Sequence, residues 1–321
     1  MHQATTTDYR YPHFRTRYLL ADLRFDPASP GPGDQLPEFD LRVLDGPPLT
    51  YDTLDRPHLF VFGSSTCPMT LGAAEPLRRL HEEFGGRVRF VLVQVREAHP
   101  GDRFGQAATF EEKVAQARRL RATLDLPLTV AVDDLEGSFH TSLDPKPNAA
   151  YLVDRGGRIV FRSIWSSDEQ ALRAALDAAG SGEVPRRGQS RRMVGPVLAA
   201  LGYVDDVLRL AGPRAARDLA ISAPPMLLAG RLATLFRGLR PERRGPAAVA
   251  LLAVVGTAIV SAVTGCKDEA RRPGGHRCRG AGHTEPPTIA GESGSAGRAR
   301  ELAQDPRARS AARGPGDHAH R

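Results

Sequence analysis

The first half of the sequence predicts an α/β fold. Short apolar runs alternate with segments of helical periodicity between residues 33 and 180, which is the pattern of strands joined by helices. Hydrophobic residues make up 41% of the 321 residues and charged residues 25%, so the composition excludes a chain that is disordered throughout. We therefore expect an α/β domain at 33–180, preceded by an N-terminal extension at 1–32.

The individual elements of this domain follow from the apolar pattern. Runs rich in apolar and β-branched residues predict strands at 59–62, 88–95, 128–132, 151–153 and 158–161. Amphipathic segments predict helices at 68–84, 109–123 and 168–179, and an extended segment at 34–45 precedes the first strand. The resulting order, β-α-β-α-β-β-α with a terminal hairpin, predicts a thioredoxin-like sheet.

The composition changes after a Gly/Pro/Arg-rich linker expected at 181–192. Apolar residues at helical spacing predict amphipathic helices over 193–245. Residues 246–265 carry no charge and are long enough to cross a ~30 Å hydrocarbon core, but six of these twenty residues are alanine. A transmembrane helix and a buried or interfacial helix therefore remain alternatives. Residues 266–321 lack periodicity and predict a disordered, basic tail.

Basic residues are concentrated in the C-terminal part. The net charge of +7 divides into −5 for residues 1–185 and +12 for residues 186–321. This division favours contact with an anionic membrane through residues 191–265, whereas nucleic-acid binding is not expected because no aromatic residues lie among the arginines of the tail. Residues 1–24 contain no apolar signal segment, so we expect a cytoplasmic catalytic domain, with 246–265 as its candidate membrane anchor.

One cysteine lies where a strand is expected to meet a helix. The predicted strand at 59–62 leads into Gly63-Ser64-Ser65-Thr66-Cys67-Pro68, and Pro68 suits the first position of a helix. Cys67 is then placed at a helix N-terminus, where the dipole favours a thiolate and lowers the thiol pKa. The hydroxyl groups of Ser64, Ser65 and Thr66 are candidate donors to the sulfur. The alternative is that Cys67 is a small buried hydrophobic residue.

Two further groups are expected near this cysteine. His99 follows the second strand at the same edge of the sheet, where its imidazole could stabilise the thiolate or protonate a leaving group. Glu97 could orient His99, although a solvated carboxylate and a surface histidine are the alternatives. Either Pro145 or Pro147 precedes the strand at 151–153, where thioredoxin folds place a cis-proline opposite the active-site cysteine. Pro147 is our candidate for the residue that positions substrate.

Two motifs resemble the iodothyronine deiodinases, thioredoxin-fold selenoenzymes that remove iodine from thyroid hormones. The motifs are Phe62-Gly63-Ser64-Ser65-Thr66-Cys67-Pro68 and Glu97-Ala98-His99-Pro100-Gly101-Asp102, in that order. Residues 110–118 resemble the helix that follows in the family, and residues 33–45 resemble the entry segment of peroxiredoxin-like domains. The resemblance implies a catalytic role for Cys67, in place of selenocysteine, and a proton-handling pair formed by Glu97 and His99.

The sequence departs from the family at several positions. Cysteine replaces selenocysteine, which implies slow deiodination, and Ala107 stands where the family has a second histidine. Arg162 corresponds to an arginine of a late strand in the family and is a further candidate for substrate contact. Residue 70 is threonine, so the site is not a dithiol, and the scattered Cys266 and Cys278 could complete a cycle only if the tail folds back.

The sequence therefore predicts a thiol-dependent oxidoreductase with one reactive cysteine. Its expected substrate is a peroxide, a disulfide or a halogenated aromatic, with the first two favoured because selenium is missing. We expect no cofactor and no metal, and we expect an external reductant such as thioredoxin or a low-molecular-weight thiol. The alternative is a non-catalytic, partner-binding thioredoxin-fold module that its C-terminal half tethers to a membrane.

Overall fold

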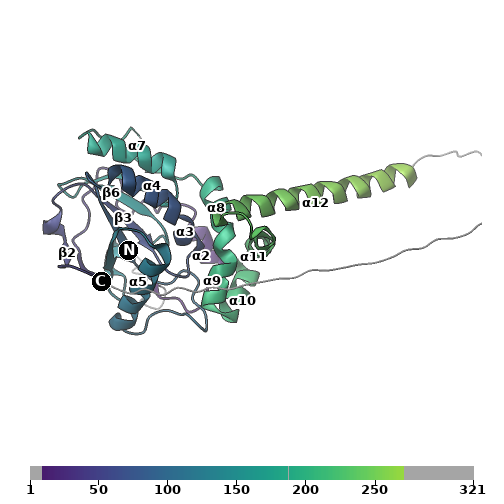
Figure 1. Cartoon of the computed structure of the whole chain (residues 1–321), viewed down its shortest axis with the longest axis horizontal. Coiled ribbons are helices and arrows are strands. Elements are labelled where there is room, and N and C mark those ends of the chain that lie inside the picture. Colours follow the sequence, from purple (N-terminus) through teal and green to yellow (C-terminus); the bar gives the residue numbers. More distant parts are fainter. Residues whose placement is uncertain (1–8, 187, 271–321) are drawn as a thin grey trace, which may run out of the picture. The chain divides into compact units, whose positions relative to one another are not determined.

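The computed structural model describes residues 9–186 and 188–270, and within the last helix it leaves out the side chains of residues 259 and 262–270. Figure 1 shows an α/β domain followed by a group of helices. The sheet has eight strands in the order β2-β1-β5-β4-β3-β6-β7-β8. The strands are β1 (Asp40–Val43), β2 (Leu49–Thr50), β3 (His58–Gly63), β4 (Arg89–Gln94), β5 (Thr129–Val132), β6 (Ala150–Val153), β7 (Ile159–Ser163) and β8 (Gln189–Ser190).

The centre of the sheet has the predicted thioredoxin-like topology. Strands β3, β4 and β5 pair in parallel, and β6 and β7 form an antiparallel hairpin beside β3. The helices of this domain are α3 (Pro68–Gly72), α4 (Ala74–Phe84), α5 (Phe110–Leu124), α6 (Ser138–Ser142) and α7 (Glu169–Gly180), with a short 3₁₀ helix η1 (Tyr51–Thr53) after β2. The predicted fold class and the order of the predicted elements are therefore confirmed, although the expected helix over 68–84 is divided at Ala73 and α6, between β5 and β6, was not expected.

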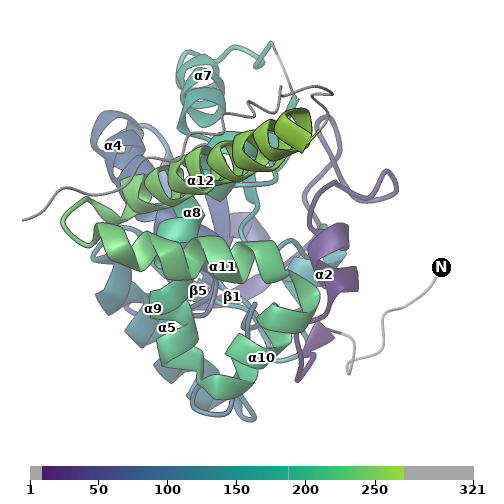
Figure 2. The same cartoon turned by 90° about the vertical axis from the view of Figure 1, so that its right-hand side faces the viewer.

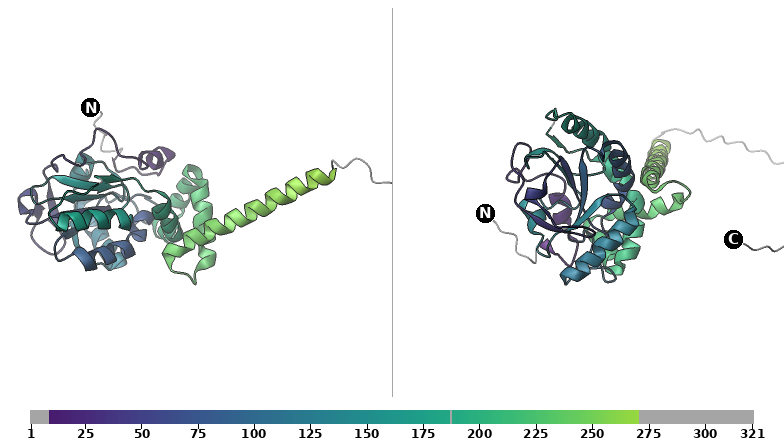
Figure 3. Two further views of the ribbon diagram at one scale, coloured as in Figure 1. Left: turned by 90° about the horizontal axis from the view of Figure 1, so that it is seen from above. Right: turned by 60° about the vertical axis from the view of Figure 1, so that its left-hand side comes forward.

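The two faces of the sheet bury separate cores. On one face, apolar residues of β3 to β7 pack against α4, α5 and α7, and Figure 3 shows helices lying along this face. On the other face, Phe60, Phe62 and Tyr151 pack against the N-terminal segment and α6. Cys67 and Trp165 belong to this second core. Side chains alternate along β3, so one set points toward α4, α5 and α7 and the other points into the core that contains Cys67.

The C-terminal part forms helices that pack on the N-terminal segment. These are α8 (Val194–Ala200), η2 (Leu201–Tyr203), α9 (Val204–Ala211), α10 (Pro213–Ser222), α11 (Pro224–Ala233), η3 (Thr234–Phe236) and α12 (Pro241–Ala270). A third apolar core joins them to Tyr11 and Phe14, close to α2 (Thr16–Ala21). Figure 2 shows α8 to α11 gathered at one end of the sheet, with α2 beside α10. We call this assembly of residues 9–25 and α8 to α11 the cover.

The structure bears on three expectations about the parts outside the central strands. The segment 181–192, expected as a linker, contributes β8, which pairs in parallel with β7 through Arg162 and Ser163. Among the residues that the structure describes, no helix is long and apolar enough to cross a membrane. The expected disordered tail begins within α12, and its remainder, 271–321, lies outside the described residues.

Candidate active site

Cys67 occupies the strand–turn–helix position that the sequence predicts. Strand β3 ends at Gly63, and Cys67 is the N-cap of α3, with Pro68 at the first helical position. Gly63 allows the close approach of α3, because a Cβ atom built there would lie 2.8 Å from Cγ2 of Thr70. The first turn of α3 is thereby held against the end of the strand. Thr70 occupies the place of the second cysteine of a Cys-x-x-Cys motif.

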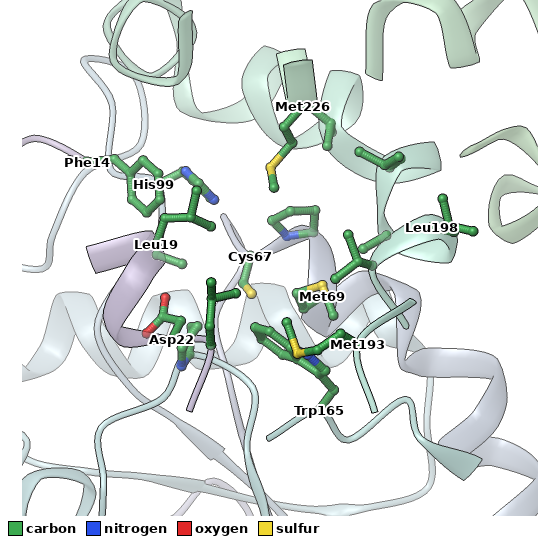
Figure 4. A pocket seen from close by; sticks show the side chains of 18 of the residues that line it. Phe14, Leu19, Asp22, Cys67, Met69, His99, Trp165, Met193, Leu198 and Met226 are labelled. Carbon is green, nitrogen blue, oxygen red and sulfur yellow. The ribbon is translucent and has the colours of Figure 1, made fainter. Parts of the chain in front are cut away.

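The side chain of Cys67 lines an apolar cavity of about 430 Å³. Figure 4 shows this cavity, with Cys67 among side chains from the sheet domain and from the cover. The sheet domain contributes Met69, His99, Pro147 and Trp165. The cover contributes most of the remaining wall, which comprises Phe14, Leu19, Asp22, Leu23, Val194, Val197, Leu198, Ala200, Leu201, Val204 and Met226. Cys67 is only 1% exposed, so a reactant reaches it through this cavity.

The expected lowering of the thiol pKa is wrong in direction. Burial raises the pKa of Cys67 from 9.0 to about 11, and the charge of Asp22 adds to this. The Thr70 hydroxyl and the backbone amides of Met69 and Thr70 oppose the rise without overcoming it. Helix α3 has only five residues, so few aligned peptide dipoles compensate for the lost water. Cys67 is therefore a thiol at neutral pH in this structure, and a nucleophilic reaction of its sulfur would require a proton acceptor.

Glu97 connects the two loops of the site. Its carboxylate is fully buried and accepts hydrogen bonds from Thr66 N (2.8 Å), Thr66 Oγ1 (2.6 Å) and Gln94 Nε2 (3.0 Å). Burial raises the pKa of Glu97, and these hydrogen bonds oppose the rise. Thr66 Oγ1 in turn accepts a hydrogen bond from the backbone N–H of His99 at 3.1 Å. Glu97 therefore holds the loop before Cys67, and it positions His99 through Thr66 rather than by touching the ring.

His99 lines the same cavity as Cys67 and is neutral at pH 7. Burial lowers its pKa from 6.5 to about 4. Its ring packs against Phe14 of the cover, with ring centroids 4.3 Å apart. Within the described residues, His99 Nδ1 has no hydrogen-bond partner. The histidine is thus available to a ligand as a neutral hydrogen-bonding group, whereas a charged imidazolium, the form expected beside a thiolate, is disfavoured.

The remaining predicted site residues are divided between the cavity and the framework. Ser64 Oγ accepts a hydrogen bond from Ala98 N at 3.2 Å, so Ser64, like Thr66, binds the loop that carries His99. Ser65 is buried, and its Oγ has no hydrogen-bond partner among the described residues.

The two candidate prolines differ in their surroundings. Pro147 lines the cavity, whereas the carbonyl oxygen of Pro145 accepts a hydrogen bond from Arg96 at 3.0 Å. Of the two prolines, Pro147 is therefore the one that faces the cavity.

Arg162 is not brought to the cavity. Its guanidinium lies 4.2 Å from the ring centroid of Phe25 and donates hydrogen bonds to Pro30 O (2.9 Å) and Ser29 Oγ (3.2 Å). The expectation that Arg162 contacts substrate is thus replaced by a structural role, in which the arginine fastens the N-terminal segment to β7. Trp165 does line the cavity, and its Nε1 donates a hydrogen bond to Met193 Sδ at 3.1 Å.

Sequence reasoning missed the contribution of the cover to this site. Asp22 and Phe14 lie in the expected N-terminal extension, and Met226 lies in a helix expected only to be amphipathic. None of these residues belongs to a recognisable motif. The one available signal was the unpartnered apolar face that helical spacing predicts over 194–208, which requires a partner but does not identify it.

Comparison with known proteins confirms the resemblance in the motifs. Residues 31–176, under half of the chain, match the iodothyronine deiodinase family model. A type II iodothyronine deiodinase from Fundulus heteroclitus is 32% identical over 100 residues, which cover 27% of this chain and 36% of that protein. The chain thus spans about a third of the length of this curated relative. The matched residues coincide with the part of the chain that forms the thioredoxin-like sheet and its helices.

Solved structures of bacterial proteins are also similar. An uncharacterized conserved protein from Geobacillus kaustophilus is 22% identical with a TM-score of 0.41, over 49% of this chain and 87% of that chain. A thio-disulfide isomerase from Thermus thermophilus is 25% identical with a TM-score of 0.37, over 46% of this chain and 96% of that chain.

Proposed function

We propose that the segment matching the iodothyronine deiodinase family acts as a thiol-dependent reductase of small apolar molecules, and that its substrate is an organic hydroperoxide. One observation carries this proposal: Cys67 and the neutral His99 line the same apolar cavity. A cavity of this composition favours an uncharged ligand with an apolar body, and the sulfur would meet the reactive end of that ligand.

The proposed reaction uses one cysteine and an external thiol. Cys67 sulfur attacks the terminal peroxide oxygen, the S–O bond forms as the O–O bond breaks, and the products are a sulfenic acid on Cys67 and an alcohol. Two molecules of a low-molecular-weight thiol, or one dithiol such as reduced thioredoxin, then return Cys67 to the thiol and release water and a disulfide. Thr70 stands where an internal resolving cysteine would be, which is why the reductant comes from outside.

The other substrate classes fit the site less well. A disulfide on a folded protein would have to reach a sulfur that is only 1% exposed. An iodinated aromatic would suit the apolar walls, but a thiolate attacks iodine less readily than a selenolate does. Ala107 also stands where the family has a second histidine. It is buried, and its carbonyl oxygen accepts a hydrogen bond from the Arg10 side chain at 3.1 Å.

Turnover by the full chain tests this proposal. We would measure thiol-dependent consumption of cumene hydroperoxide, hydrogen peroxide, oxidised glutathione and an iodinated phenol, with Cys67→Ser as the inactive variant and Cys266→Ser as its matched control. We expect cumene hydroperoxide to react at least about tenfold faster than hydrogen peroxide, because the phenyl group is buried in the cavity. Turnover that survives Cys67→Ser, or a preference for the disulfide or the iodinated phenol, would overturn the proposal.

A second candidate function is association with an anionic membrane. Leu228 of α11, Leu235, and Val254 of α12 are exposed apolar residues, and Arg237, Arg240 and Arg243 are exposed nearby in sequence. Apolar side chains beside arginines suit a surface of acidic lipids, where each basic residue contributes on the order of 1 kcal/mol. We expect the full chain to sediment with vesicles containing phosphatidylserine at low salt. Binding equal to that of neutral vesicles would remove this candidate.

A further inference from the structure

The wall of the cavity contains one carboxylic acid, Asp22. It caps the C-terminal end of α2, only 8% of its surface is exposed, and it lies outside residues 31–176, the segment that matches the family. Cys67, His99 and Asp22 are the titratable side chains among the residues that line the cavity, and Figure 4 shows all three. An acid placed against the apolar wall of a cavity that also contains a thiol is in an unusual position, because burial penalises its ionised form.

The basic groups near Asp22 are engaged elsewhere. Lys146 pairs with Asp144 at 2.7 Å. The guanidinium of Arg96 lies over the rings of Tyr9 and Tyr11 and donates to the carbonyl oxygen of Pro145. Within the described residues, no side chain forms a hydrogen bond or an ion pair with the Asp22 carboxyl group, which therefore remains free to interact with a ligand or with Cys67.

The environment of Asp22 makes it exchange a proton near neutrality. Burial raises its pKa from 3.8 to about 7, Arg96 and Lys146 oppose the rise, and Asp144 adds to it. Asp22 also acts on the groups that face it, because its charge raises the pKa of Cys67 and of Tyr11. A carboxyl group whose pKa lies near the working pH is suited both to accept and to return a proton.

We propose that Asp22 is the proton-transfer residue of Cys67, so that the N-terminal segment completes the active site of the family-like domain. The inference rests on the proposed function. The Asp22 carboxylate accepts the thiol proton as Cys67 sulfur bonds to the terminal peroxide oxygen and the O–O bond breaks. Asp22 then gives that proton to the alkoxide oxygen that leaves, which yields the alcohol and restores the carboxylate. The alcohol thus carries the thiol proton, and no proton is left unassigned.

The other acidic and basic groups of the site suit this role less well. Glu97 already accepts hydrogen bonds from Thr66 and Gln94 and is not in the cavity wall. His99 has a pKa of about 4, so its neutral ring is a weaker base than the Asp22 carboxylate, and its charged form is rare at pH 7. His99 remains available to donate a hydrogen bond to the peroxide or to accept one from it.

The reactivity of Cys67 with iodoacetamide tests this assignment without requiring turnover. The full chain would be alkylated between pH 5.5 and 9, and peptide mass spectrometry would follow Cys67 alone. For the native protein we expect a rise in rate with a midpoint near pH 7, as Asp22 becomes ionised. Asp22→Asn should remove this rise and slow alkylation at pH 7.5 at least about tenfold, whereas Asp22→Glu should retain it. Asp26→Asn, an exposed carboxyl in the same segment, is the matched control and should behave as the native protein.

The opposite outcome has a clear physical meaning. If Asp22 only repels the thiolate, Asp22→Asn lowers the pKa of Cys67 and alkylation becomes faster at pH 7.5. A faster or unchanged rate in Asp22→Asn overturns the inference. The same variants assayed with cumene hydroperoxide should show a parallel loss in kcat/KM. If the native protein does not turn over the hydroperoxide but the alkylation profile depends on Asp22 as described, the proposed substrate fails and the role of Asp22 stands.

Discussion

The protonation states of Cys67 and His99 are set mainly by burial and not by the residues next to them in the sequence. Cys67 and His99 could be selected from the sequence because each follows a predicted strand at the same edge of the sheet. Their protonation states could not be predicted, because the apolar cover that removes water from both comes from residues 9–25 and 193–226. The raised pKa of Cys67 and the lowered pKa of His99 are two consequences of that one tertiary contact.

The stability of the protein should fall in acid because of His99. Its folded pKa, about 4, lies below its ordinary value of 6.5, so the stability it contributes is present above pH 6.5 and is lost as the pH falls toward 4. Between pH 7.5 and 4.5 this amounts to about 2–3 kcal/mol. His99→Gln should therefore lose less stability than the native protein over this interval, measured by urea unfolding at both values. An equal loss in the two proteins would show that His99 is not desolvated in solution.

At the scale of elements, the first turn of α3 decides whether the site has one thiol or two. Thr70 lies in that turn, and its hydroxyl lowers the pKa of Cys67, which places residue 70 beside the sulfur. Thr70→Cys should therefore produce an intramolecular disulfide on mild oxidation, detected as the loss of both thiols and of two hydrogens in mass. The double variant Cys67→Ser/Thr70→Cys should form none. A Thr70→Cys protein in which the thiols at positions 67 and 70 both stay free after oxidation would contradict this geometry.

The loop of the second family-like motif is also the contact that fixes α9. A Cβ atom built on Gly101 would lie 1.9 Å from the carbonyl oxygen of Ala211, which accepts hydrogen bonds from Arg103 N and Phe104 N. Asp102 Oδ1 accepts a hydrogen bond from Arg214 N at 2.9 Å and so caps the N-terminal end of α10. The motif therefore serves two functions, since it carries His99 and anchors the cover.

Gly101→Ala should consequently separate the cover from the loop. The added methyl group forces the backbone of Ala211 away, and we expect a loss of about 2 kcal/mol or more in unfolding free energy. Amide hydrogen exchange in α9 and α10 would accelerate more than exchange in β3 and β4. Gly86→Ala is a suitable control, because a Cβ atom there meets nothing within 4 Å. Equal acceleration in the sheet and the cover would argue against a local effect.

Several elements were predictable from the sequence, and the exceptions have a physical cause. The buried strands β3, β4 and β5 are continuous apolar runs, which local pattern identifies well. Strand β8 consists of Gln189 and Ser190 in a Gly/Pro/Arg-rich stretch, and it exists because the edge of β7 offers it hydrogen bonds. The role of Arg162 was misjudged for the same reason, since Phe25 and Pro30 reach it from a distant part of the chain.

At the scale of the whole molecule, the sheet and the cover should differ in stability. The cover joins the chain's N-terminal segment to helices about 200 residues away, and its own core contains Leu208 and Leu219 but none of the residues of the sheet. A unit that closes so long a loop around a small core is expected to open locally before the sheet unfolds. Opening of this kind would admit substrate to Cys67 and would return water to the sulfur.

A pair of matched leucine variants tests this opening. Leu219→Ala weakens the core of the cover without altering the cavity wall, whereas Leu120→Ala weakens the core under α5 on the opposite face of the sheet. Each should cost about 2–5 kcal/mol locally. We expect Leu219→Ala to accelerate alkylation of Cys67 at pH 7.5 at least about tenfold, because opening exposes the sulfur and lowers its pKa, and we expect Leu120→Ala to change the rate little. Equal acceleration in both variants would mean that Cys67 is exposed only by global unfolding, and that the cover is no separate gate.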